Sequence, residues 1–185
     1  MAPKSPRVVN IPISGDVAYN QPIHTVVGGL VISSAQAESV FLTILRHLTR
    51  RDDLSAAIIW HSFRGSNKSR LDLLLRLGRE RLRDAALLKE LAAACRRFIG
   101  LTNVRNFYCH SLFRYDKDGR IFAVQGVQLT YEDDPVKITN KRMSVATLNE
   151  ITDATRKLIQ LSRTTWALSD RIADELEVPR EPRPE

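Results

Sequence analysis

Apolar residues recur every three or four positions over four long stretches of the chain, and this period predicts amphipathic helices. The predicted helices cover about residues 20–48, 52–82, 84–113 and 147–176. Glycine lowers helix stability by about 1 kcal/mol relative to alanine, so it marks weak points in two of them. We expect a kink at Gly65-Ser66-Asn67 and a break at Gly100, after which Thr102 caps a short continuation.

Capping residues mark the start of each stretch. The side chains of Asn20, of Asp52 or Asp53, and of Asp84 can accept hydrogen bonds from first-turn amides. Thr147 and Glu150 have the spacing of a capping box, which predicts the start of the last helix.

The apolar period changes from three or four to two between the third and fourth predicted helices. Phe113 and Tyr115 alternate with charged residues, Asp118-Gly119 is typical of a turn, and Ile121 begins a second alternating run. The acidic run Glu132-Asp133-Asp134-Pro135 should end that run. The pattern predicts a β-hairpin at about residues 112–132.

Four long helices joined by short links predict an all-α fold, an up-and-down four-helix bundle, with the β-hairpin inserted between helices 3 and 4. We expect this bundle to occupy residues 20–176. The proline-containing residues 1–19 should form an extended N-terminal arm, and residues 177–185 a disordered tail.

The composition limits the class of protein and the cellular location that we expect. With 43% apolar and 26% charged residues, the 185-residue chain resembles an ordinary globular domain. Cys95 and Cys109 are too few for a disulfide framework, which fits a reducing cytoplasm. We expect no membrane-spanning segment, because no uninterrupted apolar run approaches 18 residues.

The net charge of +7 is concentrated in one part of the chain. Residues 64–97 hold ten Lys/Arg and four Asp/Glu, a balance of +6. Arginine outnumbers lysine 21 to 7, and its planar guanidinium suits phosphate groups. An RNA-facing surface that includes Arg64, Lys68 and Arg70 is one interpretation. A solvated helix face that keeps the protein soluble is the other.

One short segment combines side chains that can do chemistry. Arg105, Asn106 and His110 follow the break predicted at Gly100. Asn106 and His110 are four residues apart and share a helix face, whereas Arg105 is offset from His110 by about 140°. Two copies related by a two-fold axis would surround one cleft with two arginines and two histidines.

Such a cleft could cleave RNA without a metal or cofactor, because the attacking 2′-hydroxyl belongs to the substrate. His110 would act as the general base, since an imidazole titrates near neutral pH. Arg105 would stabilise the charge that develops on phosphorus, and Asn106 would orient the histidine or hold a phosphate oxygen.

Structural interpretations stay open for the same residues. His110 could bond the hairpin or a backbone carbonyl, and Arg105 could pair with a carboxylate.

Other polar residues also have more than one interpretation. Glu38 could reach Arg105 or be exposed. Arg70 could contact RNA or form a surface ion pair with Asp72. His61 fits a core or edge histidine, and His24 and His47 lack zinc-ligand spacing with either cysteine.

The segment Arg105-Asn106-Phe107-Tyr108-Cys109-His110 resembles the Arg-(Asn/Asp/His)-x3-His signature of the HEPN superfamily. Shorter stretches around Ala56–Ser62 and Ser69–Asp72 are similar to bacterial members, and the likeness covers about residues 20–175. The resemblance implies a homodimeric, metal-independent endoribonuclease, often a toxin or defence effector with a cognate antitoxin. Arg105 and His110 match its catalytic positions, and Asn106 the supporting one.

Some members of that superfamily only bind RNA, nucleotides or proteins, so the resemblance leaves an enzyme and a non-catalytic binding module both open. The predicted hairpin departs from the minimal bundle, and we expect it to reshape or cover the cleft.

Overall fold

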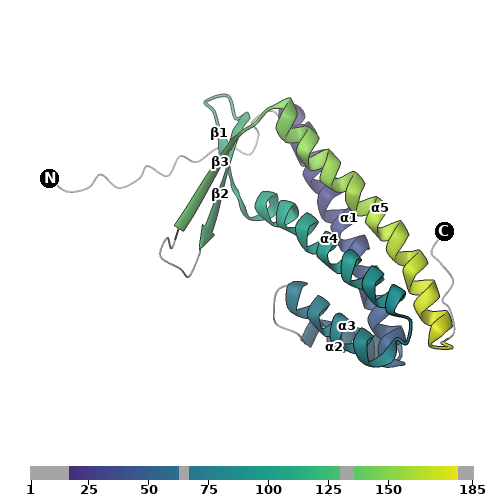
Figure 1. The fold of residues 1–185 in the computed structure, drawn as a ribbon. Helices are drawn as coiled ribbons and strands as arrows, with labels where there is room; N and C mark the ends of the chain where they lie inside the picture. The colour runs from purple at the N-terminus through teal and green to yellow at the C-terminus, as the bar shows by residue number, and fades with distance from the viewer. Residues whose placement is uncertain (1–16, 63–66, 130–135, 179–185) are drawn as a thin grey trace.

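The computed structural model of the chain describes residues 17–62, 67–129 and 136–178. These ranges form a mostly helical fold with a small antiparallel sheet between the last two helices (Figure 1). In chain order the elements are α1 (Val17–Thr49), α2 (Asp53–Ser62), α3 (Asn67–Arg81), α4 (Ala85–His110), β1 (Leu112–Tyr115), β2 (Ile121–Leu129), β3 (Val136–Arg142) and α5 (Val145–Glu175).

Several expectations concern residues outside these ranges. The extended arm over residues 1–16, the kink at Gly65-Ser66, the acidic run 132–135 and the tail from residue 179 all lie there. Within the described part, residues 17–19 belong to α1 instead of to an arm.

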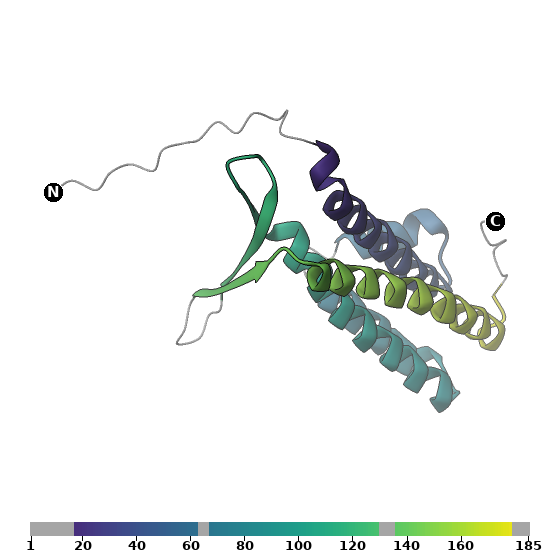
Figure 2. The ribbon, with the colours of Figure 1, turned by 90° about the horizontal axis from the view of Figure 1, so that it is seen from above.

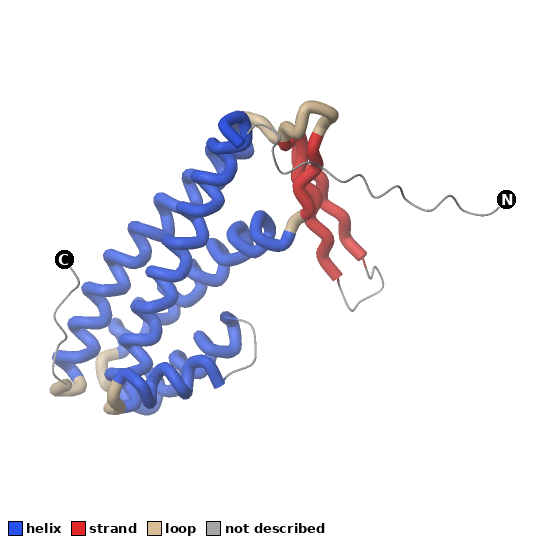
Figure 3. Tube along the Cα trace, turned by 180° about the vertical axis from the view of Figure 1, so that it is seen from behind, coloured by secondary structure: helices blue, strands red, loops and turns tan. Residues whose placement is uncertain are grey.

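The three long helices α1, α4 and α5 pack together, and α2 and α3 lie against α1 at the end away from the sheet (Figure 1). Seen from above, the sheet projects beyond the ends of these helices (Figure 2). The view from behind shows helices and sheet segregated at opposite ends of the molecule (Figure 3).

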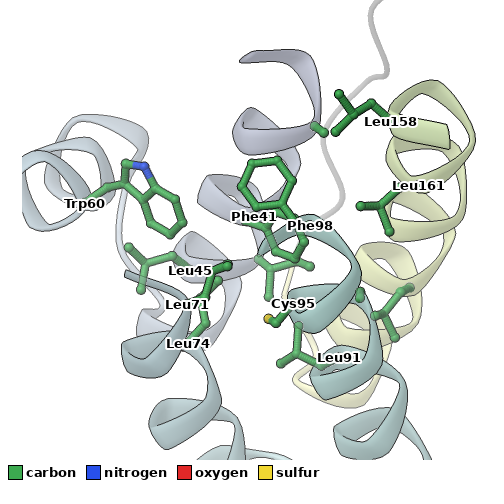
Figure 4. Close-up of a cluster of buried hydrophobic side chains, with 14 of the residues drawn as sticks. Phe41, Leu45, Trp60, Leu71, Leu74, Leu91, Cys95, Phe98, Leu158 and Leu161 are labelled. Atoms are coloured by element: carbon green, nitrogen blue, oxygen red, sulfur yellow. The ribbon is translucent and has the colours of Figure 1, made fainter. Parts of the chain in front are cut away.

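Apolar side chains from all five helices form the core between them. Phe41 of α1 and Phe98 of α4 face each other with ring centroids 5.1 Å apart, and Leu158 of α5 lies beside them (Figure 4). Trp60 of α2 and Leu71 of α3 extend this cluster (Figure 4). Burying each of these side chains stabilises the fold by roughly 1.5–3 kcal/mol.

The predicted second helix is two helices. Asp52 begins α2 as expected, because its carboxylate accepts a hydrogen bond of 2.9 Å from the backbone N–H of Ser55. That bond lowers the pKa of Asp52. Beyond α2 the chain resumes at Asn67 in α3, whose Leu71 and Leu74 are buried.

The predicted break at Gly100 is wrong, and α4 runs without interruption from Ala85 to His110. Thr102 does not cap a new segment; its buried hydroxyl donates to the Ile99 carbonyl within the same helix. The buried Phe98 on the same face holds this part of the helix in place, and packing outweighs the propensity cost of one glycine. The Asp84 cap is confirmed, with its side chain accepting from the Ala86 N–H.

The predicted hairpin is confirmed, and a third strand that was not predicted extends it. The turn uses Gly119 at φ 76°, a left-handed conformation that suits glycine. β3 pairs antiparallel with β2, giving the order β1-β2-β3. Val136 and Ile138 alternate with Lys137 and Thr139, a short period-two pattern that could have indicated this strand.

Two predicted caps have other roles. α1 begins before Asn20, whose buried amide instead donates to the Gly119 carbonyl at 2.9 Å and accepts from the Ile121 N–H at 3.0 Å. This pair of bonds fastens the hairpin turn to α1. The N-cap of α5 is Ser144, which accepts from the Thr147 N–H, so the predicted capping box with Glu150 is wrong.

By length and mean hydropathy, the part of α1 over Asn20–Thr49 is long and apolar enough to cross a membrane. Core helices of water-soluble proteins meet the same criterion. Leu30, Phe41 and Ile44 of this helix are fully buried against its neighbours, which is the packing expected of a core helix. The absence of a membrane segment and a cytoplasmic location stay predictions.

Candidate functional site

A cleft of about 450 Å³ lies between the C-terminal turns of α4 and the sheet. Its lining residues are Asn103, Asn106, Phe107, His110, Ser111, Gly126 and Thr139. The local sequence brings these elements together because β1 begins two residues after His110, the last residue of α4. The sheet is thereby fixed at the end of the helix that carries the predicted motif.

Close contact between Phe107 and β2 shapes the wall of this cleft. A Cβ atom on Gly126 would lie 2.3 Å from the Phe107 ring, closer than any side chain permits. Glycine is therefore required at this position for the strand backbone to approach the helix.

The structure brings two of the three predicted catalytic residues into the cleft. Asn106 and His110 are exposed, one turn apart, and both line it. No residue in the described ranges makes a hydrogen bond to the His110 side chain, so the predicted bond to the hairpin or to a backbone carbonyl is not found there. The imidazole is open to solvent and to a substrate.

Arg105 is not among the lining residues, in agreement with its expected angular offset from His110. Its guanidinium donates to the Asn106 side-chain oxygen at 2.8 Å, which links it to the cleft. Its Nε is buried and lacks a hydrogen-bond partner among the described residues. The partner found for Arg105 is thus an amide, and no carboxylate within the described ranges pairs with it.

A cluster behind the cleft was missed by sequence reasoning. Lys141 of β3 contacts both Glu150 carboxylate oxygens, at 2.6 and 2.7 Å, and lies 4.8 Å from the Phe107 ring centroid. The Tyr108 hydroxyl donates to Glu150 at 3.0 Å, and burial together with Glu150 raises the pKa of Tyr108. The cluster connects β3, α4 and α5, and so supports the Phe107 wall.

Glu38 neither reaches Arg105 nor is exposed. It accepts hydrogen bonds from the Trp60 indole at 3.1 Å and from Arg70 at 2.6 Å. Arg70 therefore pairs with Glu38 and not with Asp72, and its guanidinium carbon lies 5.7 Å from the Trp60 ring centroid. This mostly buried group joins α1, α2 and α3.

The three residues predicted to contact RNA differ in their exposure and in their contacts. Lys68 is exposed at the start of α3, the Arg70 side chain is 19% exposed and engaged by Glu38, and Arg64 lies outside the described residues. Further exposed cations on or near α3 and α4 are Arg76, Arg79, Arg81, Arg83, Lys89, Arg96 and Arg97. The two helices pack together, so these charges occupy neighbouring surfaces.

The remaining histidines differ in burial. His61 is exposed, so the expected core or edge position is wrong. His47 is buried, and burial, with the nearby Arg46 charge, lowers its pKa. Within the part of the chain that the structure describes, no three His, Cys, Asp or Glu side chains gather as a metal site would require.

Comparison of the chain with models of protein families, with curated proteins and with solved structures found no match. The chemistry of the cleft is therefore the basis for a function. One exposed imidazole can transfer a proton, two carboxamides can bind oxygen or nitrogen atoms, and a guanidinium lies within reach of one of those amides.

Proposed function

We propose that this chain is a metal-independent endoribonuclease whose active site is completed across a homodimer. The observation that supports it best is the exposed His110 imidazole in an open cleft, with Asn106 beside it and Arg105 bonded to Asn106. These three residues are the ones that carry the resemblance to the HEPN superfamily.

In the proposed reaction, His110 accepts the proton of a ribose 2′-hydroxyl, and the 2′-oxygen attacks the adjacent phosphorus. The bond from phosphorus to the 5′-oxygen breaks, leaving a 2′,3′-cyclic phosphate and a 5′-hydroxyl. Arg105 exchanges its Asn106 partner for the phosphoryl oxygens and stabilises their added charge. Asn106 holds a phosphate oxygen through its amide.

A second copy would complete this chemistry. The 5′-oxygen must receive a proton as it leaves, and His110 is the only imidazole among the described residues that line the cleft. The His110 of a symmetry-related chain, in its protonated form, would act as that acid. The exposed positions of Asn106 and His110 leave this end of α4 free to meet a second copy.

We further propose that α1, α4 and α5, with the α2–α3 pair in place of the second helix, correspond to a four-helix bundle of HEPN type, and that the sheet is an insertion. A cytoplasmic toxin or defence effector, held inactive by a cognate antitoxin, fits this assignment. The exposed cations of α3 and α4, with Lys68 and Arg64, would bind the RNA backbone, so that affinity falls steeply with salt.

A non-catalytic RNA- or nucleotide-binding or protein-interaction module is the second candidate. Two observations favour it: one chain supplies one imidazole to the cleft, and Arg105 is already bonded to Asn106. This module would bind RNA in a salt-sensitive way and leave it intact.

Incubation of the purified chain with single-stranded RNA in EDTA tests the proposal. We expect cleavage to 2′,3′-cyclic phosphate ends, detected by mass spectrometry, and at least a hundredfold slower cleavage by His110→Ala. His61→Ala removes an exposed histidine far from the cleft and should leave the rate unchanged.

An RNA with a single 2′-deoxynucleotide at the cleaved position should resist cutting there. RNA binding without cleavage would contradict the endoribonuclease and support the non-catalytic binding module. Equal cleavage by His110→Ala and the unmodified chain would contradict the role given to His110.

A further inference from the structure

We infer that the sheet gives the cleft a pocket for one nucleobase, in which Asn103 and Thr139 select the base next to the bond that His110 cleaves. The inference rests on the proposed function and extends it to substrate selection. It concerns the part of the cleft formed by β2 and β3.

The lining of the cleft suits a neutral, planar group. Apart from His110, the described lining residues hold carboxamides, hydroxyls, one phenyl ring and a glycine, with no Lys, Arg, Asp or Glu among them. Arg105 reaches the cleft only beside Asn106, so the part lined by Asn103 and Thr139 holds no cation of its own for a phosphate, whereas a base edge offers donors and acceptors that pair with amides and hydroxyls. Proteins recognise single-stranded RNA through such hydrogen bonds to the edges of unstacked bases.

Asn103, which we propose contacts the base, lies two turns before His110, which we propose accepts the proton. Asn103, Asn106 and His110 lie at positions i, i+3 and i+7, on one helix face. Seven residues of helix span roughly 10 Å, which is enough to place a base beside Asn103 while its ribose reaches His110. The volume of about 450 Å³ lies within the range of small-molecule sites.

The sheet supplies the opposite wall. Thr139 of β3 pairs directly with Gly126 of β2, so the two residues occupy the same face of the sheet. Because Gly126 has no side chain, the edge of the Phe107 ring lies directly against the strand backbone, in the same cleft wall as Thr139. A base that enters the cleft can contact this apolar wall while Asn103 and Thr139 bond its edge.

Binding measurements on the full chain test this inference separately from cleavage. Fluorescence anisotropy with labelled A12, C12 and U12 in EDTA, using the His110→Ala chain so that no substrate is lost, gives the ratio of dissociation constants between bases. We expect a preference of about tenfold for one base. Asn103→Ala and Thr139→Val should each reduce that ratio to about threefold or less, with the slope of affinity against salt unchanged.

Matched controls keep the result interpretable. Asn140→Ala changes the neighbouring residue of β3, which faces the other side of the sheet, and Asn149→Ala changes an exposed asparagine of α5. Both should keep the full preference. Circular dichroism and thermal melting of every variant identify any that fail to fold, and those variants are replaced by Asn103→Asp and by Thr139→Ala, which also removes the hydroxyl.

Each outcome bears on the inference. Equal affinity for the three oligomers, absence of RNA binding, or a preference that survives both folded variants would overturn it. If RNA binding shows a base preference but the unmodified chain does not cleave RNA, the base pocket is supported and the endoribonuclease is contradicted. If the chain cleaves RNA without a base preference, the endoribonuclease is supported and the base pocket is contradicted. Mononucleotides bound as tightly as oligomers, with the same preference, would support the pocket and identify free nucleotides as its ligands.

Discussion

The two halves of α4 use the same helix face for different purposes. In the first half, Leu91, Cys95 and Phe98 are buried against the other helices. The same spacing continues through the buried Thr102 to Arg105, which is partly exposed, and to Cys109, which is exposed. The face therefore becomes more exposed where the sheet becomes the neighbour of the helix (Figure 1).

This difference shows how a stable scaffold can present reactive groups. The first half of α4, together with the buried Thr102 and Tyr108 of the second half, anchors the helix, so Asn103, Asn106 and His110 can be exposed and still be held in place. A motif at the end of a well-packed helix is thereby both rigid and accessible, as a catalytic site requires.

The largest expected difference between the halves is in thiol reactivity. Burial raises the pKa of Cys95 to about 12, so at pH 8 only ~1 in 10,000 molecules carries its thiolate. We expect iodoacetamide to alkylate the exposed Cys109 in the folded chain and to leave Cys95 unmodified until urea is added. Peptide mapping by mass spectrometry distinguishes the two sites. Equal labelling of both thiols would show that the first half of α4 is not closely packed.

Stability should show the next largest difference. Phe98→Ala removes a fully buried ring that contacts Phe41, and a loss of about 3–5 kcal/mol in the free energy of unfolding is expected. Asn106→Ala, on the exposed half, should change it by less than ~0.5 kcal/mol. Urea titration followed by circular dichroism measures both. A cost for Asn106→Ala near that of Phe98→Ala would mean that the site residues carry the fold.

The smallest effect concerns pH. The pKa of the buried His47 lies below its usual value of 6.5, so the unfolded chain binds a proton more readily than the folded one. Stability should therefore fall as the pH drops below 6.5 and level off once His47 protonates in the folded state.

Urea titrations at pH 7 and pH 5 check this expectation. His47→Gln should flatten the dependence, whereas His61→Gln, at an exposed histidine, should leave it unchanged. A steeper fall in the His47 variant than in the parent chain would contradict the assignment.

How far the sequence predicts this molecule depends on the range of the interactions. The long helices and the β1–β2 hairpin follow from local periodicity, and the 140° offset of Arg105 from His110 follows from helix geometry. Interactions between distant residues could not be read in the same way. Glu150 appeared to be part of a cap but binds Tyr108 and Lys141, and Glu38 binds Arg70, thirty-two positions away.

The third strand shows the same limit in the candidate site. The alternation of Val136 and Ile138 with polar residues covers only four residues, so it is a weak strand signal, and the place of β3 is set by pairing with β2. The presence of Thr139 in the cleft follows from that pairing. The helical side of the site and the hairpin beside it were accessible from sequence, whereas the pairing that brings Thr139 into the site was not.

The bonds from Asn20 to Gly119 and Ile121 join segments about a hundred positions apart, 99 and 101 residues respectively. During synthesis the first helix leaves the ribosome long before this turn exists, and its main packing partner, α5, comes later still. The nascent chain must therefore keep part of the apolar surface of α1 uncovered until α5 has been made. We expect chaperones to shield α1 during that interval, and the cleft to be assembled only after β3 has been made.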